Sequence, residues 1–335
     1  MTNIAEKIRV SFAGRKVVIV GDVVADQFLH GTIARVSREA PVFILRHDST
    51  DTRAGGAANA AANVAALGGA PVLIGITGTD ENGRLLRESL TAAGVDCETI
   101  VADGNIKTTT KVRVLAGQDY APRQQVIRID YENASAISSG VRERLIDNLR
   151  QSGAGAAAII VSDYNYGVAQ NSIVDEARRI SRERGVPLVV DSRFRLREFS
   201  NATSATPNQE EVEMILGKGF TDEGCIELRR DLGYDALLVT CGNNGMLLVE
   251  DGVAPIRIPA VGSRQPIDVT GAGDTVIAAY ALGLASGLSF TEAASAANHA
   301  GGIVVMKKGT AVATREELLE SISDASGSPV AVPAP

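Results

Sequence analysis

The sequence predicts an α/β fold: a doubly wound, mostly parallel sheet flanked by helices, with a small inserted β-sheet. Short continuous apolar runs recur along the chain, and such runs are typical of strands buried on both faces of a parallel sheet. Helical segments separate the runs, which favours right-handed crossovers. Two extended segments rich in β-branched residues interrupt this alternation and predict the inserted sheet.

The elements follow in chain order. The strands expected in the main sheet are 16–21, 71–76, 156–161, 187–190 and 236–239. The expected helices are 56–67, 81–93, 138–151, 171–184, 208–216, 273–285 and 291–306. A hairpin is expected where Met246–Glu250 and Ala254–Ile258 flank Asp251-Gly252.

The inserted sheet is expected from residues 32–54 and 107–133. A small sheet beside a ligand crevice can act as a lid, although ordinary surface hairpins would give the same pattern. The end of the chain, 324–335, is rich in Gly, Ser, Pro and Val and is predicted to be a disordered tail.

Composition excludes several classes of function. The chain of 335 residues has 33 basic and 40 acidic residues, a net charge of −7, which argues against nucleic-acid binding. Three cysteines form no metal or disulfide framework, as expected in a reducing compartment. The N-terminus lacks the apolar core of a signal peptide, and the most apolar stretch, 275–290, is too short to cross a membrane. We expect a cytoplasmic protein with no membrane partner.

The segment Asp268-Val-Thr-Gly-Ala-Gly-Asp-Thr275 carries the strongest chemical signal. A loop of small residues, Gly271, Ala272 and Gly273, opens directly into an apolar helix. The N–H groups at a helix start lack internal partners and favour anions such as phosphate. Asp274, in the first turn, could accept a proton from a substrate hydroxyl, or it could simply cap the helix.

Other phosphate-binding loops are absent from the sequence. No GxxxxGK[ST] motif occurs, which excludes a P-loop nucleotidase. No GxGxxG motif follows the first strand, which disfavours a dinucleotide-dependent dehydrogenase.

Two segments are candidates for sugar binding. Gly55 and Gly56 begin a helix that carries Asn59; they would let a ligand approach the backbone while the amide contacts hydroxyls, or form a tight packing turn. Asp22 ends the first strand, at the edge where doubly wound folds bind ligands. Its carboxylate could accept hydrogen bonds from two hydroxyls, or cap a turn.

Two further segments are candidates for the nucleotide. In Thr206-Pro-Asn-Gln-Glu-Glu211, Asn208 and Glu211 have the spacing of a capping box, but they could also face a hydrated magnesium ion and phosphates. Thr240 ends a strand, and Gly242 and Gly245 follow it, either to approach a nucleotide phosphate or to form a β-turn.

Together these segments, over about residues 15–320, resemble the ribokinase-like, phosphofructokinase-B-type carbohydrate kinases. The early Gly-Gly-x-x-Asn and the late Asp-Val-Thr-Gly-Ala-Gly-Asp are the specific motifs. Within the family, the kinases of D-glycero-β-D-manno-heptose 7-phosphate are the most similar. The stretches that support this are 31–42, 53–59, 107–114, 124–130 and the helix of Asn298.

The resemblance implies a kinase domain over 1–323 whose β lid often forms a dimer interface. It implies ATP as donor, magnesium, and Asp274 as catalytic base beside an anion hole of Gly271, Ala272 and Gly273. Matched residue by residue, the resemblance implies sugar contacts at Asp22, Gly55, Gly56 and Asn59. It implies contacts with magnesium and phosphates at Asn208 and Glu211, and ATP-binding stretches at Thr240, Gly242, Gly245 and Asn298. It also implies a monovalent-cation site, plausibly for potassium, at Asp268 and Thr270.

Arg128 is a further candidate on physical grounds alone. A lid arginine can make bidentate contact with a sugar phosphate, although a solvated strand residue would look the same.

The chain departs from the heptose-phosphate kinases in three places. They typically have Ser-Asp-Tyr-Gly-Lys-Gly where this chain has Asn165 and Tyr166, and Asp-Pro-Lys where it has Ser192 and Arg193. An insertion falls near 117–123. The chain is also expected to be a stand-alone kinase without the nucleotidyltransferase half of a bifunctional enzyme.

The alternatives are kinases of ribose, a fructose phosphate, ketodeoxygluconate or a nucleoside, and a non-catalytic sugar- or nucleotide-binding regulator. A regulator has no need of a base at Asp274, so the motif disfavours it.

Overall fold

The computed structural model describes residues 4–118, 123–133, 137–263 and 265–327. Its main sheet has the strand order β13-β12-β11-β10-β9-β8-β1-β4-β5, parallel except that β12 runs antiparallel to β11 and β13. The strands are β1 (Lys16–Gly21), β4 (Ala70–Gly78), β5 (Ile100–Asp103), β8 (Ala158–Asp163), β9 (Leu188–Ser192), β10 (Ser204–Ala205), β11 (Ala236–Thr240), β12 (Met246–Glu250) and β13 (Ile256–Ile258).

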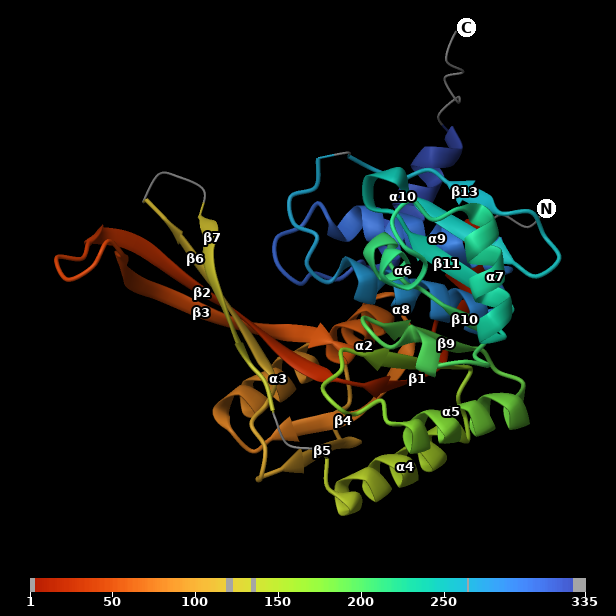
Figure 1. The fold of residues 1–335 in the computed structure, drawn as a ribbon, viewed down its shortest axis with the longest axis horizontal. Helices are drawn as coiled ribbons and strands as arrows, with labels where there is room; N and C mark the ends of the chain where they lie inside the picture. The colour runs from red at the N-terminus through yellow and green to blue at the C-terminus, as the bar shows by residue number, and fades with distance from the viewer. Residues whose placement is uncertain (1–3, 119–122, 134–136, 264, 328–335) are drawn as a thin grey trace, which may run out of the picture.

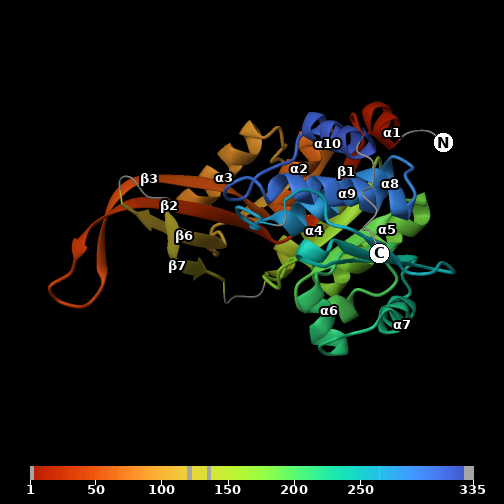
Figure 2. The same cartoon turned by 90° about the horizontal axis from the view of Figure 1, so that it is seen from above.

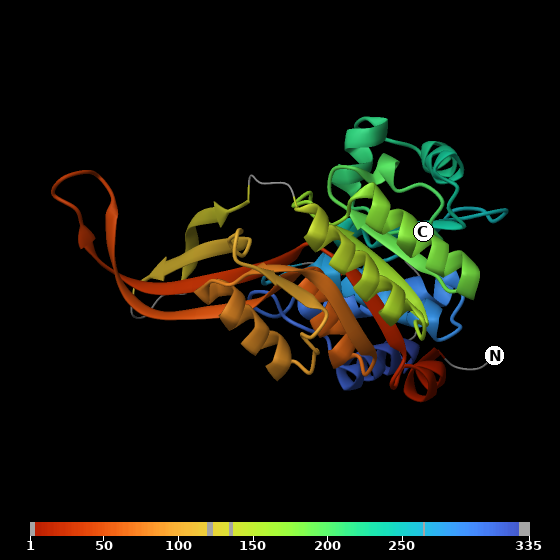
Figure 3. The same ribbon diagram turned by 90° about the horizontal axis from the view of Figure 1, so that it is seen from below.

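Helices cover both faces of this sheet, which is why its strands read as continuous apolar runs. Val17 and Ile19 of β1 pack into one core, and Val18 and Val20 into the other. The first core also takes α1 (Ile4–Ser11), α2 (Ala57–Ala66), α3 (Glu81–Ala92), α8 (Ala272–Ala285), α9 (Phe290–Val304) and α10 (Arg315–Gly327). The second takes α4 (Ser139–Gly153), α5 (Asn171–Arg184), α6 (Gln209–Leu216) and α7 (Asp222–Leu232). Figure 3 shows α4 and α5 side by side across that second face.

A separate four-stranded sheet, which we call the lid, projects from one end of this body (Figures 1 and 2). Its order is β3-β2-β6-β7, with β2 parallel to β6. The strands are β2 (Val23–Val36), β3 (Phe43–Gly56), β6 (Thr110–Gly117) and β7 (Gln124–Tyr131). The predicted lid is confirmed, but its first strand begins at Val23 rather than near residue 32. Residues 119–122 of the expected insertion lie outside the described residues.

The predicted strands, helices and hairpin of the body are confirmed within a few residues of their expected ends. Helices α1, α7 and α10 and strands β5 and β10 were not predicted. Strand β10 has only two residues, and the apolar positions of α7 are separated by many charges. Helix α10 continues to Gly327, and residues 328–335 of the expected tail lie outside the described residues. Among the residues described, no helix is long and apolar enough to cross a membrane.

Candidate active site

The side chain of Asp274 lies buried in the first turn of α8, with 3% of its surface exposed. Its Oδ2 accepts a hydrogen bond from Asn59 Nδ2 at 2.9 Å, and its Oδ1 accepts one from the Tyr164 hydroxyl at 2.7 Å. Burial raises the pKa of Asp274 to about 6, while the bonds from Asn59 and Tyr164 lower it. A carboxyl with a pKa near neutrality is well suited to accept a proton.

The amide of Asn59 is held in one orientation by its neighbours on α2 and α8. Asn63 Nδ2 donates to Asn59 Oδ1 at 3.2 Å, and the Thr275 hydroxyl donates to Asn63 Oδ1 at 3.0 Å. Asn59 therefore directs its N–H group at Asp274, and it also donates to the carbonyl of Gly271 at 3.3 Å. This arrangement places the Gly-Gly-x-x-Asn segment directly against the late helix.

Helix α8 begins at Ala272, one residue before the predicted start, with Gly271 as its N-cap at φ 78°. Within the part of the chain that the structure describes, the N–H groups of Gly271 and Gly273 have no protein acceptor. The Ala272 N–H donates to Val269 O at 3.2 Å, so the predicted set of three amides is reduced to two. Free N–H groups at a helix start can stabilise negative charge.

A cleft of about 430 Å³ opens in front of Asp274. Asn208 and Glu211 line it from the start of α6, and Thr240 lies beside Asn208 in a parallel bridge. Asn208 and Glu211 form a reciprocal capping box, with bonds of 2.9 and 2.8 Å. The capping alternative is therefore correct. It uses Asn208 Oδ1 and Glu211 Oε2, which leaves the Asn208 amide nitrogen and Glu211 Oε1 outside the box, and both residues line the cleft.

Asp191, at the end of β9, was not predicted and lines the same cleft as Glu211. Burial, and then the nearby charge of Glu211, raise the pKa of Asp191 well above its ordinary range. Burial also raises the pKa of Glu211 to about 6. Two neighbouring carboxylates that resist ionisation are a donor set that a divalent cation would satisfy.

A second cavity, of about 190 Å³, continues from the cleft through Thr240 and Gly273. Gly242 and Gly245 border the short turn η2 (Gly242–Asn244) on one side of it. Asn298 of α9 lies on another side and donates to the carbonyl of Pro259 at 2.7 Å. Much of the remaining wall is apolar: Met246, Val261, Val269, Val276 and Val305. The structure thus brings together the predicted nucleotide residues.

Asp26 of β2 is a second buried carboxylate at the junction of lid and body, and the sequence analysis missed it. It forms an ion pair with Arg113 of β6, with 2.5 Å between Oδ1 and Nη1. A Cβ atom on Gly55 would lie 2.6 Å from Asp26 Oδ2, so this close approach requires glycine. Burial raises the pKa of Asp26, and Arg113 lowers it.

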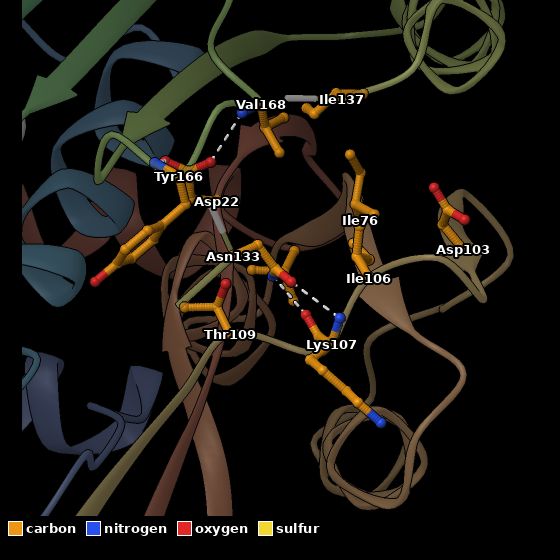
Figure 4. A pocket seen from close by; sticks show the side chains of 11 residues that line it. Asp22, Ile76, Asp103, Ile106, Lys107, Thr109, Asn133, Ile137, Tyr166 and Val168 are labelled. Carbon is orange, nitrogen blue, oxygen red and sulfur yellow. Dashed lines mark hydrogen bonds between the residues drawn. The ribbon is translucent and has the colours of Figure 1, made fainter. Parts of the chain in front are cut away.

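Asp22, which was predicted either to bind sugar hydroxyls or to cap a turn, caps a turn in the structure. Its carboxylate accepts hydrogen bonds from the backbone N–H groups of Tyr164, Tyr166 and Val168, at 2.8, 3.0 and 3.0 Å. Figure 4 shows the last of these bonds, with Tyr166 beside it, at the edge of a small cavity of about 30 Å³. The side chain is 1% exposed, so the turn-capping alternative is correct. The carbonyl of Asp22 accepts a bond from Ala57 N, next to Gly56 at the start of α2.

Arg128 lies on the lid, but its guanidinium group already forms an ion pair with Asp130. Its Nε and Nη2 donate to the two oxygens of Asp130 at 2.8 and 2.7 Å. The expected bidentate contact with a sugar phosphate therefore competes with an internal ion pair.

Asp268 and Thr270 lie in the loop before α8. Asp268 accepts hydrogen bonds from the N–H groups of Thr270 and Gly309, both at 2.9 Å. Burial raises the pKa of Asp268, but these bonds outweigh it, so the pKa lies below its ordinary value. An ionised carboxylate therefore lies where the resemblance implies a monovalent cation.

Tyr164 and Asp191 could have been found from the sequence. Each lies at or directly after the end of a parallel strand, β8 or β9, and ligands bind at that edge in doubly wound folds. Asp26 had no such signal, because it lies on β2, which belongs to the lid and not to the main sheet.

The chain is similar to known proteins of one family. The model of the pfkB family carbohydrate kinases matches residues 15–317. A bifunctional protein HldE of Nitrosococcus oceani is 39% identical over 93% of this chain, and that of Alcanivorax borkumensis is 39% identical over 95%. The chain spans 64% and 66% of the length of these relatives.

Solved structures share the fold at low sequence identity. Arabidopsis thaliana ribokinase complexed with ribose and ATP has a TM-score of 0.70 and 24% identity, covering 92% of this chain and 99% of its own. Escherichia coli phosphofructokinase-2 with substrates and products has a TM-score of 0.75 and 18% identity, covering 93% and 99%. The chain belongs to the pfkB family of carbohydrate kinases.

Proposed function

We propose that this kinase transfers the γ-phosphoryl group of ATP to a hydroxyl of a sugar phosphate, with D-glycero-β-D-manno-heptose 7-phosphate as acceptor and the 1,7-bisphosphate as product. The observation that carries the proposal is the buried carboxylate of Asp274, with a pKa near 6, beside the free N–H groups of Gly271 and Gly273. The heptose rests on the resemblance of the lid stretches and on the relatives named HldE.

In the proposed reaction, Asp274 accepts the proton of the anomeric hydroxyl as its oxygen attacks the γ-phosphorus. The bond from this phosphorus to the bridging oxygen breaks, and ADP leaves. The N–H groups of Gly271 and Gly273 stabilise negative charge on the transferring group. The apolar cavity beside Asn298 would hold the adenine ring.

The carboxylates of Asp191 and Glu211 fit a divalent cation, since both face the cleft and both resist ionisation without one. Magnesium, when bound, would offset phosphate charge. The loop of Asp268 and Thr270 would hold potassium, an ion with which Escherichia coli phosphofructokinase-2 has been crystallised. Equal activity in sodium and potassium buffers would contradict that site.

The lid also suggests how the protein assembles. Apolar side chains are exposed along it: Val36, Val42, Phe43, Val126, Ile127 and Ile129. We propose that lids pair to form a homodimer, in the cytoplasm, and that lid closure limits hydrolysis of ATP by water.

A coupled ADP-release assay over a panel of sugars, sugar phosphates and nucleosides tests the function. We expect highest kcat/KM with the heptose 7-phosphate. Asp274→Asn should lower kcat by roughly 10²–10⁴ with folding intact. Asp147→Asn, an exposed carboxylate on α4, is the control and should behave as wild type. ATP binding without turnover of any acceptor would point to a regulator instead.

A further inference from the structure

The lid face that meets the body carries charged side chains in rows across its strands. Residues opposite one another on neighbouring strands share a face. Asp26, Lys111 and Asp130 are paired across β2, β6 and β7, and Arg113 and Arg128 are paired two residues further along. On this face Arg113 pairs with Asp26, and Arg128 pairs with Asp130.

Lys111 is the exception in this arrangement. Its side chain is buried, with 6% exposed, yet within the described residues its ammonium group has no hydrogen bond or ion pair. It lies instead over two aromatic rings, 5.0 Å from the ring centre of Tyr164 and 5.5 Å from that of Tyr166. Ring faces attract a cation, but a buried ammonium group normally has an anionic or carbonyl partner.

The position of this ammonium group points to the acceptor side of the site. The ammonium group lies over the ring of Tyr164, and the hydroxyl of Tyr164 donates a hydrogen bond to Asp274. The neighbouring carboxylate, Asp26, belongs to the same lid row. Lys111 does not line the cavity of Asn298, where the adenine ring is proposed to lie. It is linked to the cleft in front of Asp274 through Tyr164, which lines that cleft.

We propose that Lys111 binds the phosphate group that the acceptor sugar already carries, and so selects a sugar phosphate over the free sugar. This inference rests on the proposed function. It moves the expected phosphate contact from Arg128, whose guanidinium group is bound by Asp130, to Lys111. The other cation of this row, Arg53 on β3 opposite Asp26, donates to the backbone carbonyls of Lys308 and Thr310. Among the described residues, the ammonium group of Lys111 has no such partner. An ammonium group held by rings keeps its three N–H donors available for phosphate oxygens.

Lys111→Met tests the inference, with Lys111→Arg as the charge-preserving variant. Lys218→Met, which removes an exposed charge between α6 and α7 far from the lid (Figure 1), is the matched control. We expect Lys111→Met to raise KM for the sugar phosphate roughly 10- to 100-fold, the size of one charge-assisted hydrogen bond. KM for ATP and kcat/KM for the unphosphorylated sugar should stay unchanged, and Lys111→Arg should recover part of the loss.

Calorimetry without nucleotide gives a readout independent of turnover. The sugar phosphate should bind the wild type and the Lys218→Met variant alike, and Lys111→Met at least 10-fold more weakly. A thermal melt confirms that each variant is folded. Equal binding by Lys111→Met, or the same loss in Arg193→Met instead, overturns the inference. If the wild type phosphorylates free sugar and sugar phosphate equally, the inference about Lys111 fails, but the proposed kinase activity is still supported. If no acceptor is phosphorylated, the proposed function fails, and the calorimetric comparison still decides on Lys111.

Discussion

The hydroxyl of Tyr164 donates a 2.7 Å hydrogen bond to Oδ1 of Asp274, although the two residues are 110 positions apart in the sequence. This bond stabilises the ionised carboxylate and lowers its pKa, in opposition to burial, which raises the pKa to about 6. In the proposed reaction, Tyr164 would therefore position Asp274 and lower its pKa.

The pH profile should reveal this role. A base is active when deprotonated, so kcat/KM should fall as pH drops through about 6. In Tyr164→Phe the pKa of Asp274 rises, and the acidic limb should move to higher pH. Tyr166→Phe removes a hydroxyl that contacts Glu132 instead and is the control. An unmoved limb in Tyr164→Phe would refute the tuning role.

Asp22 should matter for stability and turnover, not for sugar affinity. In Asp22→Asn, an N–H donor replaces one of the oxygens that accept the backbone bonds of Tyr164, Tyr166 and Val168. A buried unmade bond costs about 1–3 kcal/mol, so Tm should fall by several degrees. Displacement of Tyr164 should lower kcat. Calorimetry with the sugar phosphate checks the distinction: weaker binding with an unchanged Tm would restore Asp22 as a ligand residue.

The main sheet and the late helix could be predicted because their signals are local. A strand buried on both faces is apolar at every position, and the small residues before Asp274 mark a helix start in the sequence itself. The roles of Asp22 and Arg128 could not be predicted in this way. Asp22 was assigned by its place at a strand end, but the turn that takes its carboxylate lies 142 residues later.

The basic side chains of the lid show the same limit. From sequence, Lys111, Arg113 and Arg128 are equivalent strand residues. Only cross-strand pairing shows that two of them are neutralised by Asp26 and Asp130. Tertiary pairing thus decides which cation stays available for a ligand.

Removing Arg113 should destabilise the protein in a pH-dependent way. In Arg113→Met, Asp26 stays buried without its partner, which costs about 3–5 kcal/mol when the carboxyl is ionised. Its pKa, already raised by burial, should rise further. A carboxyl whose folded pKa exceeds the unfolded one binds more protons when folded, so stability falls as pH rises between the two values. The loss in the free energy of unfolding of Arg113→Met relative to the wild type should therefore be larger at pH 8 than at pH 5.

Urea unfolding at both pH values measures that deficit. The double variant Asp26→Asn/Arg113→Met removes the unpaired charge and should recover much of the lost stability at pH 8. A deficit independent of pH, or a double variant no more stable than Arg113→Met, would mean that Arg113 stabilises the lid by packing alone.

Gly271 should be required both for its backbone conformation and for the position of Asn59. A Cβ atom there would lie 2.5 Å from Asn59 Nδ2, the atom that donates to Asp274. Gly271→Ala should therefore displace the Asn59 amide and lower kcat roughly 10- to 100-fold. It should also destabilise the fold by about 1–2 kcal/mol, because φ is 78°.

Gly287 supplies the matched control for this variant. It follows the other end of α8 at φ 80°, and a Cβ atom there would meet nothing within 4 Å. Gly287→Ala should thus carry a similar backbone cost of about 1–2 kcal/mol with no loss of kcat. Steady-state kinetics and thermal melts on both variants separate the two effects. If Gly271→Ala loses no more activity than Gly287→Ala, the contact between Gly271 and Asn59 does not position the base, and Asn59 must be held by Asn63 alone.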